Sequence, residues 1–524
     1  NIYAGIAAGA DFSYAAAVAP QDQYQAAFGS RTVGILAGHY DEFFFNKSAD
    51  EKTAEEQKIT GTVTYKDFVA TNSGKAFLGF AADGSPTAGQ FYTVDSGEVL
   101  LDGNAVRASQ SGERVVYTPN QTHPWNHFSK TATADLITFY THAFDGVTSP
   151  SQTNWNLAAD NQIWMFKELF NFVALIGFFL LFVPLLSLLL KLPVFKRAVV
   201  PATDPLPQAK TSAGKTAGWL AMLISAALPA LLFARLMDKT DTGLVPLWIT
   251  ALFVVAAGVI AALVGRKNGD APFAKGGLLF GGVGLVLFAV LRFGGSILSL
   301  SPVFSEPTVN QIAYWALVSG LVAALLLIGF YYVGNRPAGV QFGQYGITRS
   351  LPVIGASLAA ALAAVVLGYG LLFGIQAVFG VDFRIWTLAV RTFKVEHLLV
   401  ALRYLPVFFI YYFVNTVALN ANTRGRRGGT ALAIGLNIGG LVVWLALQYG
   451  LDFATGVAMY PAQALNGILL VALAPCLAIA AVFPRRLYEK TNNVWLAACL
   501  NAMLFTMITC ANTALFWHLV NAAA

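Results

Sequence analysis

Charged residues are scarce in this chain, and their scarcity excludes an ordinary soluble enzyme. Of its 524 residues only 11% are charged and 56% are hydrophobic, whereas soluble domains carry about 25% charged residues. Cysteine is scarcer still, because the three cysteines, Cys476, Cys499 and Cys510, all fall in apolar runs near the C-terminus. The polar N-terminal part therefore contains no disulfide framework.

Several motifs with a defined chemistry do not occur in the sequence. It contains no Walker phosphate-binding motif, no dinucleotide-binding glycine fingerprint, no zinc signature and no G-x-S-x-G nucleophile elbow. We therefore expect neither a cofactor nor a bound metal. The positive charges lie at the ends of apolar segments, which does not indicate a nucleic-acid partner.

The two parts of the chain differ sharply in charge. Residues 1–160 contain 9 Lys/Arg and 17 Asp/Glu, a net charge of −8, whereas residues 161–524 contain 24 Lys/Arg and 10 Asp/Glu, a net charge of +14. An acidic, polar head joined to a basic, apolar body indicates two domains in two solvents. We predict a water-facing domain over 1–160 and a transmembrane domain over 161–524.

The apolar body is predicted to be a polytopic α-helical membrane domain. A helix needs about 20 mostly apolar residues to cross ~30 Å of hydrocarbon. Ten segments meet this requirement and are apolar on all faces, unlike the amphipathic helices of soluble proteins. They are 166–190, 216–236, 244–265, 276–299, 312–333, 351–379, 398–420, 430–449, 463–483 and 494–518.

The loops between these spans predict the orientation. Five alternate loops together carry 16 Lys/Arg and three acids, whereas the opposite side carries eight Lys/Arg and seven acids. Positive loops stay in the cytoplasm, so the head and the C-terminus are both expected outside. The protein is then a multi-pass plasma membrane protein with an extracytoplasmic N-terminal domain, and the lipid bilayer is its first partner.

Ionisable residues near the outer ends of the spans allow two interpretations. They either line a functional cavity or extend their charged ends to the interface. We expect Arg403 to turn inward and to pair with a carboxylate or face an outward-open polar cavity, with Glu396 and Asp382 as the nearby acids. The stretch Val381–Glu396 mixes aromatic and basic residues, which favours an interfacial helix over an irregular loop.

The head has the pattern of an α/β domain. Three short apolar runs, each closed by turn residues, are predicted to be buried strands, and a segment with helical spacing follows the last of them. The region between the second and third runs is polar and glycine-rich, and is predicted to be an insertion of turns and antiparallel strands. The three runs are 1–9, 31–38 and 113–118, the helix is 131–144, and the insertion is 46–112, with β-like segments at 75–82 and 91–101.

Polar residues at the ends of two predicted strands suggest nucleophilic acyl transfer. His123 follows the third run and would act as general base, and Asp41 follows the second run and would orient the imidazole. Glu42 and His127 are weaker candidates for the same roles. The alternative is that Asp41 is a turn residue whose carboxylate accepts hydrogen bonds from the local backbone.

The segment GILAGHYDEFF resembles the acid loop of α/β-hydrolases, and VVYTPNQTHPWNHFSKTATADLITFYTHAF resembles their final strand, histidine loop and last helix. More narrowly, THPWNHFS followed by NQIWMFKELFNFVALIGFFLLFVPL resembles bacterial membrane-anchored α/β-hydrolase family proteins, in which a hydrolase domain precedes a multi-span domain. The resemblance covers about residues 1–190. It implies a Ser-His-Asp enzyme of esterase or peptidase type.

The missing nucleophile elbow departs from that family. NIYAGIAAG is similar to strand six of the fold, so the resemblance implies that the first sheet strands and the nucleophile precede Asn1. An upstream polypeptide segment is then a second expected partner. The substrate stays open among small molecules, lipids and peptides. The alternative function is a transporter, channel or assembly scaffold with a degenerate, binding-only head.

Overall fold

The computed structural model of the protein describes residues 2–11, 28–47, 49–101, 104–145, 158–207, 211–238, 245–300 and 302–515. Its internal contacts divide the chain into two compact units. The first comprises Asn1–Lys167 together with Leu445–Ile468, and the second comprises Glu168–Trp444 together with Leu469–Ala524.

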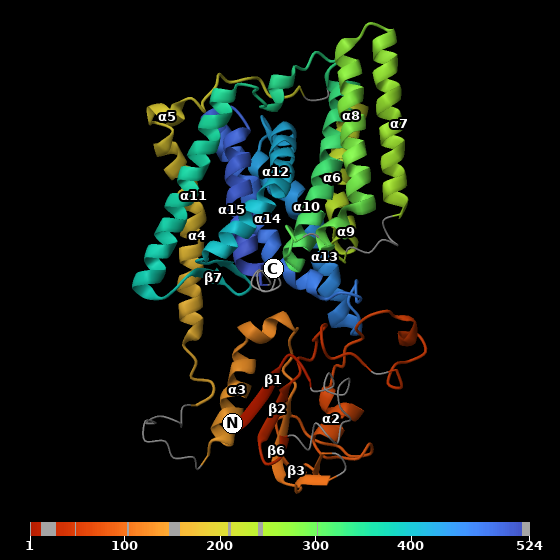
Figure 1. Ribbon diagram of the computed structural model, residues 1–524, viewed down its shortest axis with the longest axis vertical. Coiled ribbons are helices and arrows are strands. Elements are labelled where there is room, and N and C mark those ends of the chain that lie inside the picture. Colours follow the sequence, from red (N-terminus) through yellow and green to blue (C-terminus); the bar gives the residue numbers. More distant parts are fainter. Residues whose placement is uncertain are drawn as a thin grey trace. The chain divides into compact units, whose positions relative to one another are not determined.

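The first unit is built on a four-stranded sheet (Figure 1) with the order β1-β2-β6-β3. Strands β1, β2 and β6 are parallel neighbours, and β3 pairs with β6 in the antiparallel direction. The three strands predicted from the sequence are therefore confirmed. Their bounds are Ala4–Ala8 for β1, Thr32–Leu36 for β2, Tyr92–Asp95 for β3 and Ser111–Tyr117 for β6.

The sheet has an apolar cluster on each face, because alternate residues of a strand point to opposite sides. Val33 and Ile35 pack in one cluster with Phe68 and Phe77 of the insertion. Leu36 packs in the other cluster with residues of α3, notably Phe139. Helix α3 spans Lys130–Ala143, and the Ser129 hydroxyl caps it by accepting from the backbone N–H of Ala132 at 3.2 Å. The predicted helix at 131–144 is confirmed.

The insertion between β2 and β6 is only partly as predicted. Segment 75–82 is not a strand, because α2 (Asn72–Phe77) occupies its start and is capped by the Thr71 hydroxyl, which accepts from Gly74 N–H at 3.0 Å. A side-chain cap of this kind favours a helix start that hydrophobic pattern alone does not show. Antiparallel pairing is present, in β3 and in a hairpin of β4 (Val99–Leu101) and β5 (Asn104–Arg107). Two short 3₁₀ turns complete the insertion, η2 (Glu56–Lys58) and η3 (Phe68–Ala70).

Ten helices in the described part of the chain are long and apolar enough to cross a membrane. All ten predicted spans are therefore present, although residue 244 and residues 516–518 of the predicted bounds lie outside the described residues. Large apolar side chains such as Leu180 and Phe253 lie exposed on the helix surfaces, as lipid-facing residues do. The helices are α4 (Trp164–Leu189), α6 (Ser212–Asp238), α7 (Val245–Lys267), α8 (Ala271–Ala289, continuing to Ile297 through a π-helical turn), α10 (Pro307–Phe330), α11 (Leu351–Phe379), α12 (Val395–Thr423), α13 (Gly429–Thr455), α14 (Leu465–Thr491) and α15 (Trp495–Thr513). The protein is a multi-pass membrane protein.

Helix α15 is the most enclosed of the ten, with buried residues along its whole length. All three cysteines are free and buried, two of them, Cys499 and Cys510, in α15. The remaining elements of this unit are short. They are α5 (Pro193–Lys196), η5 (Val290–Gly294), α9 (Gly295–Leu300), η6 (Tyr331–Asn335) and η7 (Phe342–Tyr345).

The interfacial helix predicted over Val381–Glu396 is wrong. A two-stranded hairpin of β7 (Phe383–Ile385) and β8 (Leu388–Val390) stands there instead. Trp386 lies in its tight turn with φ of +50°. Two-residue hairpin turns require positive φ at one or both turn residues, and the β-branched and aromatic residues of the flanks suit strands better than a helix.

The prediction that Arg403 turns inward is also wrong. Its side chain is exposed on α12, and it takes part in none of the ion pairs of the described residues. Asp382 pairs instead with Arg384, two residues along the chain. Arg403 thus fits the alternative in which a long cationic side chain reaches toward the interface.

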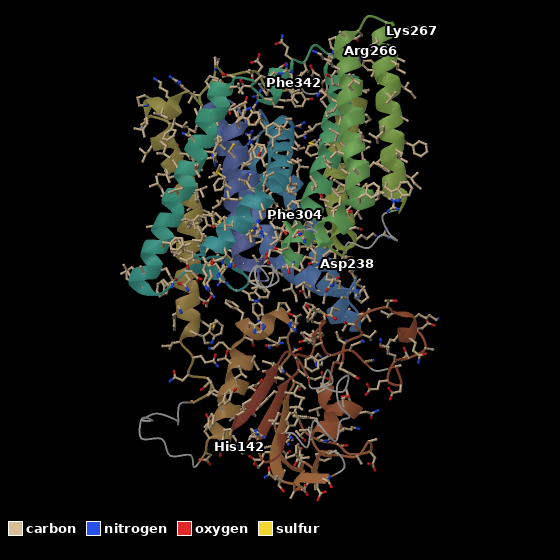
Figure 2. All side chains as sticks on the ribbon, in the orientation of Figure 1. His142, Asp238, Arg266, Lys267, Phe304 and Phe342 are labelled. Atoms are coloured by element: carbon tan, nitrogen blue, oxygen red, sulfur yellow. The ribbon has the colours of Figure 1, made fainter. Side chains whose placement is uncertain are left out.

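Arg266 and Lys267 mark one end of the helical bundle, and Asp238 lies near the other (Figure 2).

Candidate active site

The two predicted site loops lie side by side because strand pairing continues past the ends of β2 and β6. Three residues that follow β2 donate their backbone N–H groups to carbonyls at the end of β6 and in the loop after it, which keeps both loops in register. These bonds are Ala37 to Tyr117 (2.8 Å), His39 to Pro119 (2.8 Å) and Tyr40 to Gln121 (3.0 Å). Asp41 directly follows Tyr40, and His123 lies two residues after Gln121. Both candidates are thus at the carboxyl edge of the parallel strands, where open α/β sheets place their sites.

The structure brings Asp41 and His123 into direct contact. Nδ1 of His123 lies 2.9 Å from Oδ2 of Asp41. The other carboxylate oxygen, Oδ1, accepts from the backbone N–H groups of Phe43 at 3.0 Å and Phe44 at 3.1 Å. The Asp41 side chain is fully buried, and that of His123 is 15% exposed. Asp41 therefore fits both interpretations: its Oδ1 accepts from the local backbone, as in a turn, and its Oδ2 faces the imidazole of His123.

Gly9, the residue after β1, gives the imidazole its space. Its φ is +71°, and a Cβ atom there would lie 3.1 Å from Cε1 of His123 and 3.0 Å from Nδ2 of Asn126. Positive φ and this close approach both favour glycine. Asn126 in turn lies with its Nδ2 3.4 Å from Oδ2 of Asp41. The carboxyl end of β1 therefore forms one wall of the site.

The charges around His123 favour its protonated form. Burial opposes the positive charge, but the hydrogen bond to Asp41 and the negative charges of Asp41 and Glu42 outweigh it and raise the pKa of His123. In the neutral imidazole the proton belongs on Nδ1, facing the carboxylate, because an oxygen of ionised Asp41 can only accept. Nε2 is then the basic nitrogen, and it makes no hydrogen bond among the described residues.

A second carboxylate, Glu42, contacts the histidine loop. Its Oε2 accepts from the backbone N–H of His123 at 3.1 Å, and its Oε1 accepts from the hydroxyl of Tyr449 at 3.1 Å. Burial raises the pKa of Glu42 to about 7. Glu42 therefore holds the histidine loop by its backbone, and it is partly protonated near neutral pH.

Two further residues of this site come from the segment Leu445–Ile468. Tyr449 binds Glu42, and Asp452 is completely buried, with no hydrogen bond to either carboxylate oxygen within the described chain. Sequence reasoning missed both. The available signal was an acid and a tyrosine in the last turns of an apolar helix, although nothing in the sequence pairs them with residues about 400 positions earlier.

His127 is less well placed than His123. Its ring is perpendicular to that of His123, with 6.3 Å between centroids. Burial and the neighbouring imidazole both lower the pKa of His127, so it is not held as a cation beside Asp41. The residues that the structure describes contain no group of three metal-ligating side chains.

Compared with known proteins, the chain matches no family model, no curated protein and no solved structure. A buried carboxylate, an imidazole oriented through Nδ1 and a free Nε2 form a general base that can take a proton from a hydroxyl or a water molecule.

Proposed function

We propose that the N-terminal unit is the acid–histidine half of a serine hydrolase of the α/β-hydrolase type, which cleaves an ester or amide. The observation that carries the proposal is the 2.9 Å contact between Nδ1 of His123 and Oδ2 of Asp41. Orientation of the imidazole by a buried acid is the arrangement that serine hydrolases use.

The order of the strands supports the same reading. In α/β-hydrolases the acid follows one late strand, the histidine follows the last strand, and a final helix comes next. Here Asp41 follows β2, His123 follows its parallel neighbour β6, and α3 comes next.

The unpaired edge of β1 is the proposed location of the missing half. Among the described residues β1 pairs only with β2, and an open edge is a ready template for another strand. A parallel strand added there would run about 4.8 Å from β1. Its carboxyl end would then lie beside Gly9 and therefore next to His123. We propose that an upstream segment provides this strand and the nucleophilic serine after it.

In the proposed reaction Nε2 of His123 takes the proton of the serine hydroxyl while the serine oxygen attacks the carbonyl carbon. Asp41 keeps the imidazole in the correct tautomer and stabilises its positive charge. The imidazolium then returns the proton to the leaving alkoxide or amine. Water releases the acyl group by the same two proton transfers.

We also propose a location for the enzyme. The charge asymmetry of the loops favours a head outside the plasma membrane of a bacterium, with the helical unit as its anchor. The substrate would then be an extracytoplasmic or membrane-borne ester or amide. A transporter or scaffold with a binding-only head remains the second candidate, and it does not require an acid-oriented histidine.

The test is turnover of an activated ester by the membrane-embedded protein expressed together with its upstream segment. We expect His123→Ala to abolish turnover and His127→Ala to reduce it less. His142→Ala is the matched control, because His142 lies in the same domain and pairs with Glu113 at 2.9 Å, away from the site. Turnover that survives His123→Ala would contradict the proposal and favour the binding-only head.

A further inference from the structure

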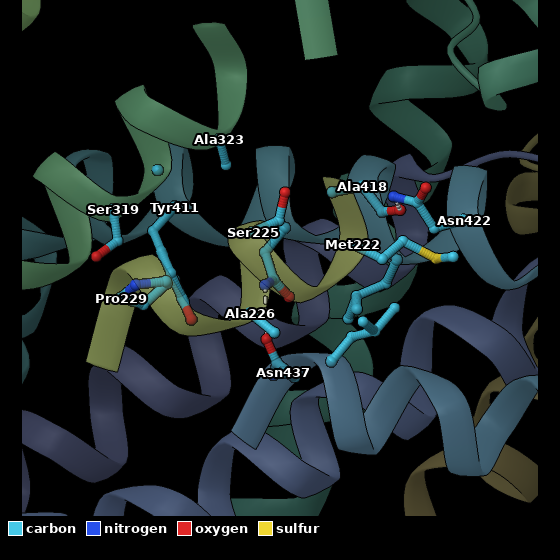
Figure 3. A pocket seen from close by; sticks show the side chains of 14 residues that line it. Met222, Ser225, Ala226, Pro229, Ser319, Ala323, Tyr411, Ala418, Asn422 and Asn437 are labelled. Carbon is cyan, nitrogen blue, oxygen red and sulfur yellow. Dashed lines mark hydrogen bonds between the residues drawn. The ribbon is translucent and has the colours of Figure 1, made fainter. Parts of the chain in front are cut away.

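A polar cavity lies within the helical unit, outside the proposed hydrolase site. Helices α6, α10, α12 and α13 enclose it, and its volume is about 80 Å³ (Figure 3). Most of the surrounding bundle is apolar, but six polar side chains line this space. They are Ser225, Ser319, Tyr411, Asn415, Asn422 and Asn437.

Hydrogen bonding fixes which way the amides of this cavity point. Nδ2 of Asn437 donates to the backbone carbonyl of Leu477 at 2.7 Å, and Nδ2 of Asn415 donates to Oδ1 of Asn437 at 2.7 Å. A carbonyl can only accept, so the chain has one direction. Donation runs from Asn415 through Asn437 to Leu477, which leaves Oδ1 of Asn415 as a buried acceptor with no hydrogen bond in the described part of the protein.

Two neighbouring polar groups also lack their usual hydrogen bonds. The hydroxyl of Ser319 is buried and has no hydrogen-bond partner among the described residues. Pro229 lies inside α6 and has no N–H, so the backbone carbonyl of Ser225 loses its usual helical donor. An unpaired polar group in a membrane interior costs several kcal/mol, by rough estimate. The cavity wall thus offers mainly acceptors in need of donors.

Among the residues that the structure describes, no charged side chain lines this cavity. An ionic ligand would therefore enter without a counter-charge, which is costly in a low-dielectric interior. The favoured ligand is uncharged and carries hydrogen-bond donors, as hydroxyl groups do.

The cavity continues into a larger one of about 330 Å³, which shares Met222, Ser225 and Asn422 with it. This second space reaches Asn335 and Tyr345 at the end of the bundle and is otherwise lined mainly by apolar residues. Its volume lies within the ~300–1,000 Å³ of small-molecule sites.

An apolar groove adjoins the second cavity. It has a volume of about 510 Å³, lies among α6, α7, α8 and α10, and shares Leu326 and Phe330 with the cavity. A hydrocarbon chain has room there. We infer that the helical unit binds an uncharged, hydroxyl-bearing molecule, with its hydroxyl groups among Asn415, Asn437 and Ser319. The shared chemistry fits a lipid alcohol such as a monoacylglycerol or a soluble polyol.

The test is native mass spectrometry of the full chain in detergent with 1-oleoylglycerol, glycerol or oleate as the probe. We expect 1-oleoylglycerol to bind, and Asn415→Leu and Ser319→Ala each to weaken binding by about 3- to 10-fold, the loss of one hydrogen bond. Ser187→Ala is the matched control, because Ser187 on α4 bonds its own helix at Val183. Thermal unfolding of each variant checks that it is folded.

Each result either supports or overturns the inferred ligand site. Binding of 1-oleoylglycerol that both cavity variants weaken assigns the site to a lipid alcohol, and the same pattern with glycerol alone assigns it to a soluble polyol. Binding that is equal for oleate, binding that no cavity variant changes, or no binding of either alcohol overturns the inference. None of these results depends on the proposed hydrolase activity.

Discussion

Replacing Asp41 by asparagine tests the orientation of the imidazole, because the backbone dictates how the new amide must lie. Oδ1 of Asp41 accepts from two backbone N–H groups, those of Phe43 and Phe44. An asparagine must keep its oxygen there, since its NH₂ group cannot accept. Its Nδ2 then faces Nδ1 of His123, which must become the acceptor, and the imidazole proton moves to Nε2. The wrong nitrogen is then protonated.

The magnitude follows from this change of tautomer. A histidine with its proton on Nε2 cannot take one from a serine, and the equivalent substitution in serine proteases lowers kcat by about 10⁴-fold, or about 5.4 kcal/mol in activation free energy. Loss of the carboxylate also removes a cause of the raised pKa of His123. Only the neutral imidazole is a base, so activity of the wild type should rise with pH through a midpoint above 6.5. NMR of ¹³C-labelled histidine should show the His123 pKa falling in Asp41→Asn.

Two results would refute this reasoning. One is an Asp41→Asn protein that retains turnover within tenfold of the wild type. The other is an unchanged His123 titration, which would mean that Asp41 does not bear on the imidazole. His127→Ala is the control for assignment, because it removes the neighbouring ring and leaves the 2.9 Å contact of His123 with Asp41 in place.

Three further predictions concern the same fold. The pKa of Glu42 is raised from 4.5 to about 7, so the folded protein loses stability as pH rises from 4.5 through 7. Glutamine does not titrate, so Glu42→Gln should raise the thermal midpoint at pH 8 by the equivalent of about 3 kcal/mol. At pH 5 the same substitution should raise the thermal midpoint little. Tyr449→Phe should leave a buried oxygen of Glu42 without its donor and cost about 1–3 kcal/mol of stability, whereas an unchanged thermal midpoint would show that the bond is dispensable. Single cysteines at Ala54 and Ser305 should react with an impermeant thiol reagent on intact cells and one at Gly425 only after permeabilisation, and labelling of Gly425 on intact cells would reverse the predicted orientation.

The spans were predictable because hydrocarbon imposes one simple condition on a helix. Every segment of about 20 apolar residues in this sequence became a membrane-type helix. Hydropathy does not specify which face of a helix packs against protein, and this explains the wrong prediction for Arg403. Hydropathy places Arg403 near a span end but does not say whether its face of α12 meets protein or lipid, and the structure leaves it exposed.

The Asp41–His123 contact was predictable because parallel strands align their carboxyl ends. Two polar residues that follow neighbouring strands must then come together, and here they lie 2.9 Å apart. Tyr449 and Asp452 could not be found in this way. Their proximity to Glu42 depends on how a distant segment packs against the acid loop, and no sequence periodicity records that packing. Side-chain capping at Thr71 likewise overrode the strand pattern of 75–82.

We propose that His123 activates a serine on a strand that pairs with β1. The direct measurement is labelling of the membrane-embedded protein, expressed with its upstream segment, by an impermeant fluorophosphonate, followed by mass spectrometric mapping of the modified residue. We expect one modified serine in the segment that pairs with β1, and loss of the label in His123→Ala but not in His142→Ala. Absence of any label, or a label that persists in His123→Ala, would contradict it.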